Sequence, residues 1–201
     1  MVHEALSSIR SRRSLAERTP GRAALLLRAP RDWLEVAGWG LRAASPESRL
    51  LVQGVVTSEA GVLLTLRREL RGWELPGGRA EPGEDERAAL VREIHEETGL
   101  QVEPLERVGE YRRSGFASHT ARVYRCRTSG GTLRPSNDTP AVTWFPVDAL
   151  PDTLFPWFRG PLRDALGPGP RPVEREERLG LAAIAAGLRI DLRMRWREEG
   201  R

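Results

Sequence analysis

Three glutamates stand at positions 93, 96 and 97, a spacing that places their side chains on one face of an α-helix. At about 100° per residue, Glu93, Glu96 and Glu97 fall within roughly a 100° arc. Carboxylates this close repel one another unless cations lie between them, and oxygen ligands at this density suit Mg²⁺ or Mn²⁺. A solvated acidic face has the same spacing, so the helix alone does not distinguish a metal site from a charged surface.

The segment before this helix contains a turn whose backbone can approach a ligand closely. Pro76, Gly77 and Gly78 leave the main chain uncovered, so that carbonyl or amide groups there can reach a metal ion or a phosphate. Glu84 adds a fourth acid at the start of the helix. Arg92 lies four residues before Glu96, close enough to pair with it. Turn and helix together favour a functional site over a solvated surface.

These residues also form one continuous pattern. It reads Gly78-x5-Glu84-x7-Arg92-Glu93-Ile94-x-Glu96-Glu97-x-Gly99-Leu100. The pattern resembles the complete signature of the Nudix hydrolase family, and no signature position departs from it. Such a match arises by chance with a probability on the order of one in a hundred million per start point. The resemblance is therefore specific, although the signature itself spans only 23 residues.

The resemblance implies a fold, a reaction and a cofactor. The fold is an α/β/α sandwich with a mixed sheet, in which the signature forms a loop, a helix and a second loop. The reaction is hydrolysis of a nucleoside diphosphate linked to another group, by water attack on phosphorus. Mg²⁺ or Mn²⁺ neutralises the phosphate oxygens and lowers the pKa of the water, and a carboxylate removes the proton. The implied substrate is a nucleotide-type small molecule.

The same resemblance assigns a role to each signature residue. The implied metal ligands are the carboxylates of Glu93, Glu96 and Glu97, with the Gly77 carbonyl as a further ligand. Arg92 would orient these acids, and Glu93 is our first candidate for the general base; the implied catalytic set is Glu93, Arg92 and Glu96.

Three further residues are implied as supporting groups. Gly78 and Glu84 would support the loop or a water bound to the metal. Asp138 precedes Trp144-Phe145, and family members often place an acid on a late loop before such a strand. Asp138 is therefore a candidate ligand or base, and the identity of the base stays open.

Residues outside the signature are candidates for holding the rest of the substrate. Arg67 and Arg68 lie just before the signature loop, where guanidinium groups can clamp phosphate. Trp73 and Phe116 can stack on a base. For both aromatic residues, packing in or over the core is the favoured alternative. The subfamily marks that we sought outside the signature are absent, so the sequence assigns no particular nucleotide.

The pattern of apolar residues predicts the elements that must position these groups. Strands are expected at residues 50–57, 62–67, 102–111, 119–126 and 142–145, the first two forming a hairpin. Helices are expected near residues 4–17, 31–43, 85–98, 151–166 and 173–186. Alternation of Ile190, Leu192, Met194 and Trp196 favours a final strand. Pro30 is expected to separate the second helix from the segment before it.

This organisation suggests a central domain with two extensions. The expected division is an N-terminal extension over residues 1–47, a Nudix domain over 48–166, and a linker and tail over 167–201. The apolar load of residues 20–45 predicts packing on the domain or homodimerisation.

The composition indicates the kind of cellular environment in which the protein works. The chain has 201 residues, 39% of them hydrophobic, and a net charge of +4 that comes from arginine alone among its basic residues. One cysteine, Cys126, excludes an intramolecular disulfide. No segment reaches the roughly 18 apolar residues that cross a bilayer. We therefore expect a cytoplasmic protein with no membrane partner.

Two other functions remain open at this point. An RNA 5′-triphosphate pyrophosphohydrolase would use the same acids, and the arginines favour it, but the chain lacks a concentrated basic tract. RNA is expected as a partner only through its 5′ end. A non-catalytic nucleotide-sensing regulator is the third reading, and the intact signature disfavours it.

Overall fold

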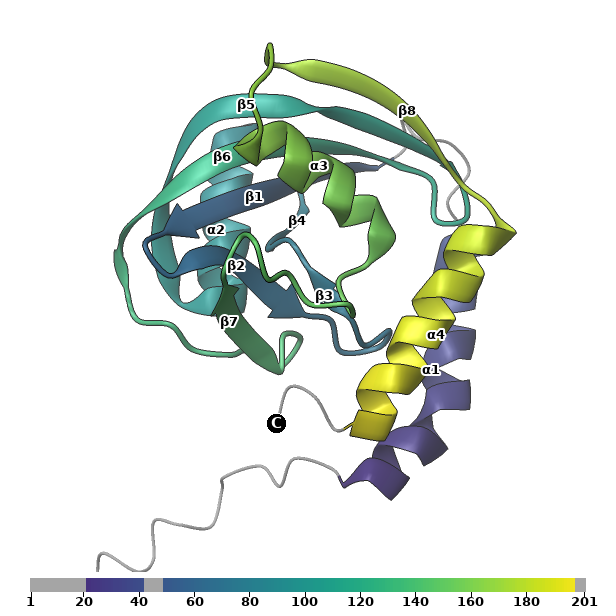
Figure 1. Ribbon diagram of the computed structural model, residues 1–201. Coiled ribbons are helices and arrows are strands. Elements are labelled where there is room, and N and C mark those ends of the chain that lie inside the picture. Colours follow the sequence, from purple (N-terminus) through teal and green to yellow (C-terminus); the bar gives the residue numbers. More distant parts are fainter. Residues whose placement is uncertain (1–20, 42–48, 198–201) are drawn as a thin grey trace, which may run out of the picture.

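The computed structural model describes residues 21–41 and 49–197 (Figure 1). The helix expected near residues 4–17 lies outside the described residues. The strands are β1 (Leu50–Ser58), β2 (Gly61–Leu66), β3 (Trp73–Glu74), β4 (Gly77–Arg79), β5 (Leu100–Gly115), β6 (His119–Gly131), β7 (Ala141–Phe145) and β8 (Val173–Leu179). The helices are α1 (Arg22–Leu41), α2 (Glu86–Thr98), α3 (Pro156–Leu166) and α4 (Leu181–Arg197). None of these helices has the length and apolar character needed to cross a membrane.

The strands form one mixed sheet of eight strands. Its main path runs β3-β2-β1-β6-β5-β8, with β4 paired to β1 and β7 paired to β2. The β1–β6 and β5–β8 pairs are parallel, and the others are antiparallel. The expected hairpin is present as β1 and β2, and the mixed α/β fold class is confirmed.

Two apolar clusters cover the two faces of the sheet. Successive residues of a strand face opposite ways, so Val56 of β1 packs with Ile94 of α2, whereas Val55 packs with Phe158 of α3. Gly54 allows α2 to lie close to β1, because a Cβ atom there would come within 2.6 Å of Ile94 Cδ1. Helix α2 is therefore fixed against the middle of the sheet.

The C-terminal tail differs from the prediction. Residues 173–179 form strand β8 rather than a helix, and they extend the sheet beside β5. Residues 190–196 belong to helix α4 rather than to a strand. In α4, Ile190 and Met194 are buried and Leu192 and Trp196 are exposed. Each of these pairs is spaced i, i+4, and the two interleaved helical pairs imitate the alternation of a strand.

The predicted helix break at Pro30 is also wrong. Helix α1 runs without interruption from Arg22 to Leu41 with Pro30 inside it. Helix α1 lies alongside α4 at one side of the sheet (Figure 1), and Leu25 and Ala29 are buried. This packing offsets the hydrogen bond that a proline removes from a helix. Leu27 and Leu34 remain exposed, and homodimerisation stays a prediction.

A buried ion network fastens the two terminal helices to each other. Arg195 and Asp191 of α4 pair at 2.8 Å, and their side chains are 1% and 0% exposed. Arg195 also pairs with Asp32 of α1 at 3.0 Å and donates to the Leu25 carbonyl. Asp191 accepts hydrogen bonds from the Trp33 indole at 2.8 Å and from the Arg71 backbone N–H at 2.7 Å. The network joins α1, α4 and the loop between β2 and β3.

Candidate active site

The acid helix α2 begins and ends at well-defined residues. The Asp85 side chain caps its N-terminus by accepting hydrogen bonds from the backbone N–H groups of Arg87 and Ala88. Gly99 ends the helix in the left-handed conformation, with φ 72°, and donates its N–H to the His95 carbonyl. These caps fix where the three glutamates stand, and the predicted helix of residues 85–98 is confirmed to within one residue.

The glycine turn lies directly against these acids. Strand β4 pairs with β1 so that Gly77 stands opposite Gln53 and Gly78 opposite Val52. A Cβ atom at Gly78 would lie 2.2 Å from Glu93 Oε2, so only glycine lets the Glu93 carboxylate approach the turn. The Gly77 N–H donates to Glu97 Oε2 at 2.9 Å. The turn and the helix therefore form one site, as the motif implies.

Arg92 organises the acid cluster. Its guanidinium holds Glu84 through two hydrogen bonds of 2.9 Å each, in the bidentate arrangement. It also donates to Glu93 Oε1 at 2.8 Å and lies 3.6 Å from Glu96 Oε2. This pairing lowers the pKa of Glu84 to about 2. The contacts agree with the orienting role expected for Arg92 and the supporting role expected for Glu84.

Two of the signature acids lie in surroundings that disfavour their charged forms. Burial raises the pKa of Glu97 to about 8, and the nearby Glu74 carboxylate acts in the same direction. Burial also raises the pKa of Glu93, against the opposing effect of Arg92. Glu96 is exposed. Burial is thus the main reason that the charged forms of Glu93 and Glu97 are disfavoured.

The donor chemistry of this cluster fits a hard divalent cation. Carboxylate oxygens on one helix face and a backbone carbonyl are the ligands that Mg²⁺ takes. Among the described residues, no three acidic, histidine or cysteine side chains are already arranged as a metal site. Glu93 is turned toward Arg92, and Glu97 toward the Gly77 N–H. Both carboxylates therefore already have protein partners, which a bound cation would have to replace or share.

Glu74 is an acid near this site that the motif does not include. It lies on β3 and pairs with Arg67, with Nη1 and Oε2 3.5 Å apart. Burial raises its pKa, and Arg67 opposes the shift. Arg67, predicted to bind phosphate, is therefore beside the acid cluster. Glu74 could have been suspected only from its place in the Trp-Glu-Leu-Pro segment that leads into the glycine turn.

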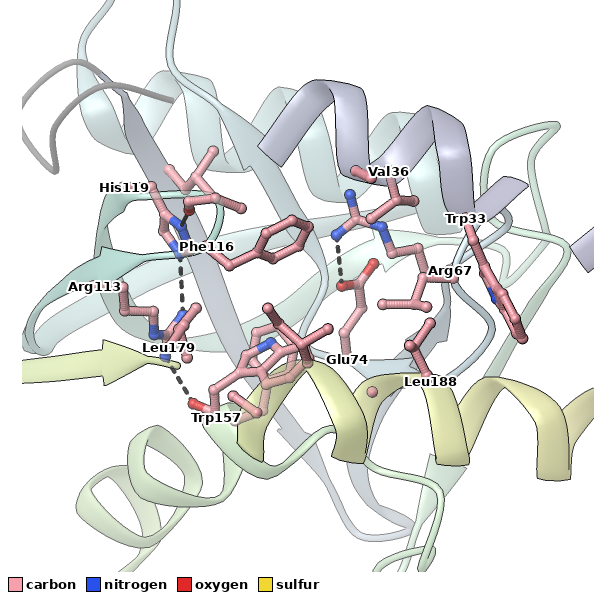
Figure 2. A pocket seen from close by; sticks show the side chains of 18 of the residues that line it. Trp33, Val36, Arg67, Glu74, Arg113, Phe116, His119, Trp157, Leu179 and Leu188 are labelled. Carbon is pink, nitrogen blue, oxygen red and sulfur yellow. Dashed lines mark hydrogen bonds and ion pairs between the residues drawn. The ribbon is translucent and has the colours of Figure 1, made fainter. Parts of the chain in front are cut away.

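A large cavity lies between the sheet and helices α1, α3 and α4, on the face of the sheet opposite α2. Its volume is about 550 Å³, and its walls are mostly apolar. Figure 2 shows the Phe116 ring extending into it from the turn between β5 and β6. Gln53, Arg67 and Glu74 line it, and Gln53 stands opposite Gly77 in the β1–β4 ladder. None of the signature glycines and glutamates lines this cavity, and Arg92 and Glu93 instead line a second hollow with Arg79, Glu81 and Pro82.

The other expected substrate residues lie in different surroundings. Trp73 is 6% exposed and packs edge-on against Phe145, with ring centroids 4.9 Å apart, so it is a core residue. Arg68 donates to the Asn137 carbonyl and lies 3.6 Å from Asp138. Asp138 is 87% exposed on the loop before β7. Asp138 pairs with Arg68 and not with a residue of the acid helix. Its role as a ligand or base stays a prediction.

Comparison with known proteins identifies the family to which this chain belongs. The family description of the NUDIX domain matches residues 48–166, more than half of the chain. A MutT-like protein of Streptomyces ambofaciens is 40% identical over 127 residues, which cover 62% of this chain and 82% of that protein. A candidate 8-oxo-dGTP diphosphatase of Mycobacterium tuberculosis is 39% identical over 125 residues, which cover 58% of this chain and 87% of that protein.

A solved structure shares the fold. The crystal structure of a Nudix hydrolase from Nitrosomonas europaea matches with a TM-score of 0.58 at 22% identity, over 65% of this chain and 78% of that one. The chain belongs to the Nudix hydrolase family, and it is a pyrophosphohydrolase. Helices α1 and α4, which line the cavity, lie outside the residues that the family description matches.

Proposed function

We propose that this enzyme hydrolyses a pyrophosphate bond in a purine nucleotide, with 8-oxo-dGTP as the first substrate to test. The observation that carries the proposal is the crowding of desolvated carboxylates on α2 against a glycine turn. Glu93 and Glu97 both have raised pKa values there, and a divalent cation would relieve this. The relative from Mycobacterium tuberculosis, whose name gives 8-oxo-dGTP as substrate, directs the choice of nucleotide.

Each group of residues has a separate role in the proposed reaction. Glu93, Glu96 and Glu97, with the Gly77 carbonyl, would hold Mg²⁺ or Mn²⁺. The bound cation supplies positive charge for the phosphate oxygens and acidifies water. Arg92 keeps Glu84 and Glu93 in place through the hydrogen bonds described above. Arg67 lies between the acid site and the cavity, where its guanidinium can contact a phosphate.

Glu93 is our candidate for the general base. Water attacks one phosphorus, the bond from that phosphorus to the α–β bridging oxygen breaks, and the products are the nucleoside monophosphate and pyrophosphate. Glu93 accepts the proton of the attacking water. Its Oε1 atom is held by Arg92 and its Oε2 atom faces Gly78, so the carboxylate is fixed at the turn. Gly78 supports this role because it leaves room for the carboxylate at the turn.

The direct test is product analysis on a panel of nucleotides with and without Mg²⁺ or Mn²⁺. The panel contains 8-oxo-dGTP, dGTP, ADP-ribose and RNA with a 5′ triphosphate. Glu97→Gln is the test variant, and Glu103→Gln is the control, because Glu103 is an exposed acid of β5. We expect metal-dependent release of a nucleoside monophosphate by the wild type and by the control, and its loss in Glu97→Gln. Titration of Mn²⁺ binding should show weaker binding by the same variant.

The alternatives give different results in this experiment. Cleavage of the RNA alone would replace our proposal with an RNA 5′-end pyrophosphohydrolase. Nucleotide binding without turnover in wild type and Glu97→Gln alike would indicate a sensor. If Glu97→Gln retained normal turnover, the proposal that the glutamates of α2 hold the catalytic metal would be wrong.

A further inference from the structure

We propose that helix α1 is an interface between two copies of this chain, with the two α1 helices antiparallel about a two-fold axis between Pro30 and Arg31. The proposal goes beyond the proposed function, because α1 lies outside the residues that the NUDIX family description matches. Leu27 and Leu34 of α1 are 82% and 75% exposed. Large apolar side chains exposed together on one helix are a candidate contact surface.

The exposed apolar residues of α1 form a stripe along one face of the helix. Leu27 and Leu34 are seven residues apart, about two turns, so they project in the same direction. Ala23 lies one turn before Leu27 and is exposed. Gly38 lies one turn after Leu34, and a Cβ atom placed there would meet nothing within 4 Å. The stripe therefore has a small residue at each end and a leucine one turn inside each end.

The order of this stripe is the same in both directions along the helix. Ala23 and Gly38 lie equally far from the midpoint between residues 30 and 31, and so do Leu27 and Leu34. A two-fold axis at that midpoint places Leu27 against Leu34 of the second copy. Small residues then face each other at both ends and let the helices approach. A two-fold interface needs this property, because one patch must be complementary to itself.

The charges beside the stripe match the same arrangement. Arg28 and Glu35 are exposed and lie on one flank of the stripe, again seven residues apart. In the antiparallel pair, each Arg28 lies only ~3 Å along the helix axis from Glu35 of the second copy. Two such ion pairs would form, one on each side of the two-fold axis. In a parallel pair the charged flanks lie on opposite sides, so the charge pattern favours the antiparallel order.

Arg31 opposes association in this arrangement. It is exposed and lies next to the proposed axis, so it would approach Arg31 of the second copy. Like charges at short distance repel each other. Removing the charge of Arg31 should therefore strengthen the dimer, whereas removing that of Arg28 should weaken it.

The proposed interface leaves the acid site open. Of the four residues in the stripe, only Leu34 lines the cavity, and α2 packs on the other face of the sheet. The interface is also small, since α1 has 20 residues and spans about 30 Å. Interfaces at the small end of the range belong to weak complexes, so we expect a dissociation constant on the order of 10 μM.

Sedimentation velocity of the full chain between about 1 and 200 μM tests the proposal. Leu27→Asp is the test variant. Leu181→Asp is the matched control, because Leu181 is 84% exposed on α4, outside the stripe. We expect the wild type and Leu181→Asp to dimerise, and Leu27→Asp to dimerise at least about a hundredfold more weakly. Leu34→Asp should act in the same way, and it gives a second reading if Leu27→Asp does not fold.

Exchange of charges tests the antiparallel order. Arg28→Glu and Glu35→Arg should each weaken the dimer about tenfold, because like charges then face each other. The double variant should restore the dissociation constant to within about threefold of wild type. Arg31→Gln should strengthen the dimer about threefold.

Three results would contradict the proposal. A wild type that is monomeric up to about 200 μM would overturn it, whether residues 1–20 or another protein covers α1. Equal dimerisation of Leu27→Asp and Leu181→Asp would overturn it by placing the interface elsewhere. A double variant that did not recover would overturn the antiparallel order. A monomer that hydrolyses nucleotides would leave the proposed function intact, because oligomeric state and turnover are measured separately.

Discussion

The acid helix and the apolar cavity lie on opposite faces of the sheet, and their charged groups are held in different ways. At α2, half-exposed charges are arranged by one arginine and two helix caps, and Glu93 and Glu97 are left in surroundings that disfavour their charge. At the cavity, apolar side chains enclose space, and the charges that fix the walls are fully buried and paired. One region presents carboxylates whose charged forms burial disfavours, whereas in the other the buried charges of Arg195 and Asp191 are paired.

This difference suggests a division of labour. Carboxylates give binding energy to a metal ion and to the phosphates that it contacts, whatever base is attached. An apolar cavity gives its contact energy through shape and apolar area instead. Substitutions in the two regions should therefore have separable effects.

The largest expected effect is on turnover at the acid helix. Glu93→Gln should lower kcat by about 10²–10⁴-fold, because it removes the proposed general base. It should leave self-association through α1 within about twofold of wild type, because α1 covers the cavity on the face of the sheet opposite α2. Steady-state kinetics and sedimentation velocity would measure the two quantities.

Glu103→Gln is the control for this substitution, since Glu103 is exposed and pairs with Arg127 at the surface. A Glu93→Gln enzyme with normal kcat would move the base to another residue, with Asp138 as the next candidate. A Glu93→Gln enzyme that also lost self-association would show that the two regions are not separable.

The next effect concerns the stability of the cavity walls. Arg195→Met leaves Asp191 buried without its main ion pair, so we expect a loss of about 3–5 kcal/mol in the free energy of unfolding. Arg193→Met on the same helix breaks an exposed pair with Asp152 and should cost less than about 1 kcal/mol. Urea unfolding of the two variants gives the comparison, and equal losses would show that the network does not hold the fold.

The acid helix was predictable from sequence because its information is local. Its caps, its acids and its glycine turn all lie within one short segment, where helical spacing and turn chemistry apply directly. The strands of the sheet were predictable for the same reason, because the alternation of apolar and polar residues in a strand can be recognised within a few residues. Strands β5 and β6 extend further than expected because pairing between them, rather than their own composition, stabilises their ends.

The cavity walls were not predictable because their partners are remote. Arg195 and Asp191 have the i, i+4 spacing of an ordinary surface pair, and only contacts with Leu25 and Glu69 reveal that they are buried. The charged segment at residues 173–179 was read as helical, yet it forms an edge strand whose Glu177 pairs with the buried Arg113. In both cases tertiary contacts override the local pattern.

A smaller effect should come from His119, which lines the cavity. Arg113 can only donate, so His119 Nε2 accepts from it and Nδ1 carries the hydrogen bonded to the Ala117 carbonyl. Burial, with Arg113 beside it, lowers the pKa of His119 to about 4. The unfolded chain therefore binds the proton more readily, and this stability is present above about pH 6.5 and is lost as the pH falls toward 4.

The measurement is the free energy of unfolding between pH 4 and 7 for wild type and His119→Gln. The wild type should lose up to about 1.4 kcal/mol per pH unit more than the variant. Other titrating groups act alike in both proteins, so the difference isolates His119. Parallel curves would show that His119 is charged or exposed in solution.

The smallest expected effect is a gain in stability, and it sharpens the contrast between the two regions. Glu97→Gln should stabilise the metal-free protein by about 1 kcal/mol. Burial raises the pKa of Glu97 to about 8, so folding near neutral pH makes this acid take up a proton, whereas the neutral amide avoids that cost and keeps an oxygen for the Gly77 N–H. Adding Mg²⁺ should then raise the melting temperature of the wild type more than that of Glu97→Gln, because only the wild type has the full set of carboxylates to offer. Gln53→Leu should respond to Mg²⁺ as the wild type does. If Glu97→Gln were less stable than wild type without metal, the acid helix would be a satisfied structure like the cavity walls, and the proposed cation site would lose its physical basis.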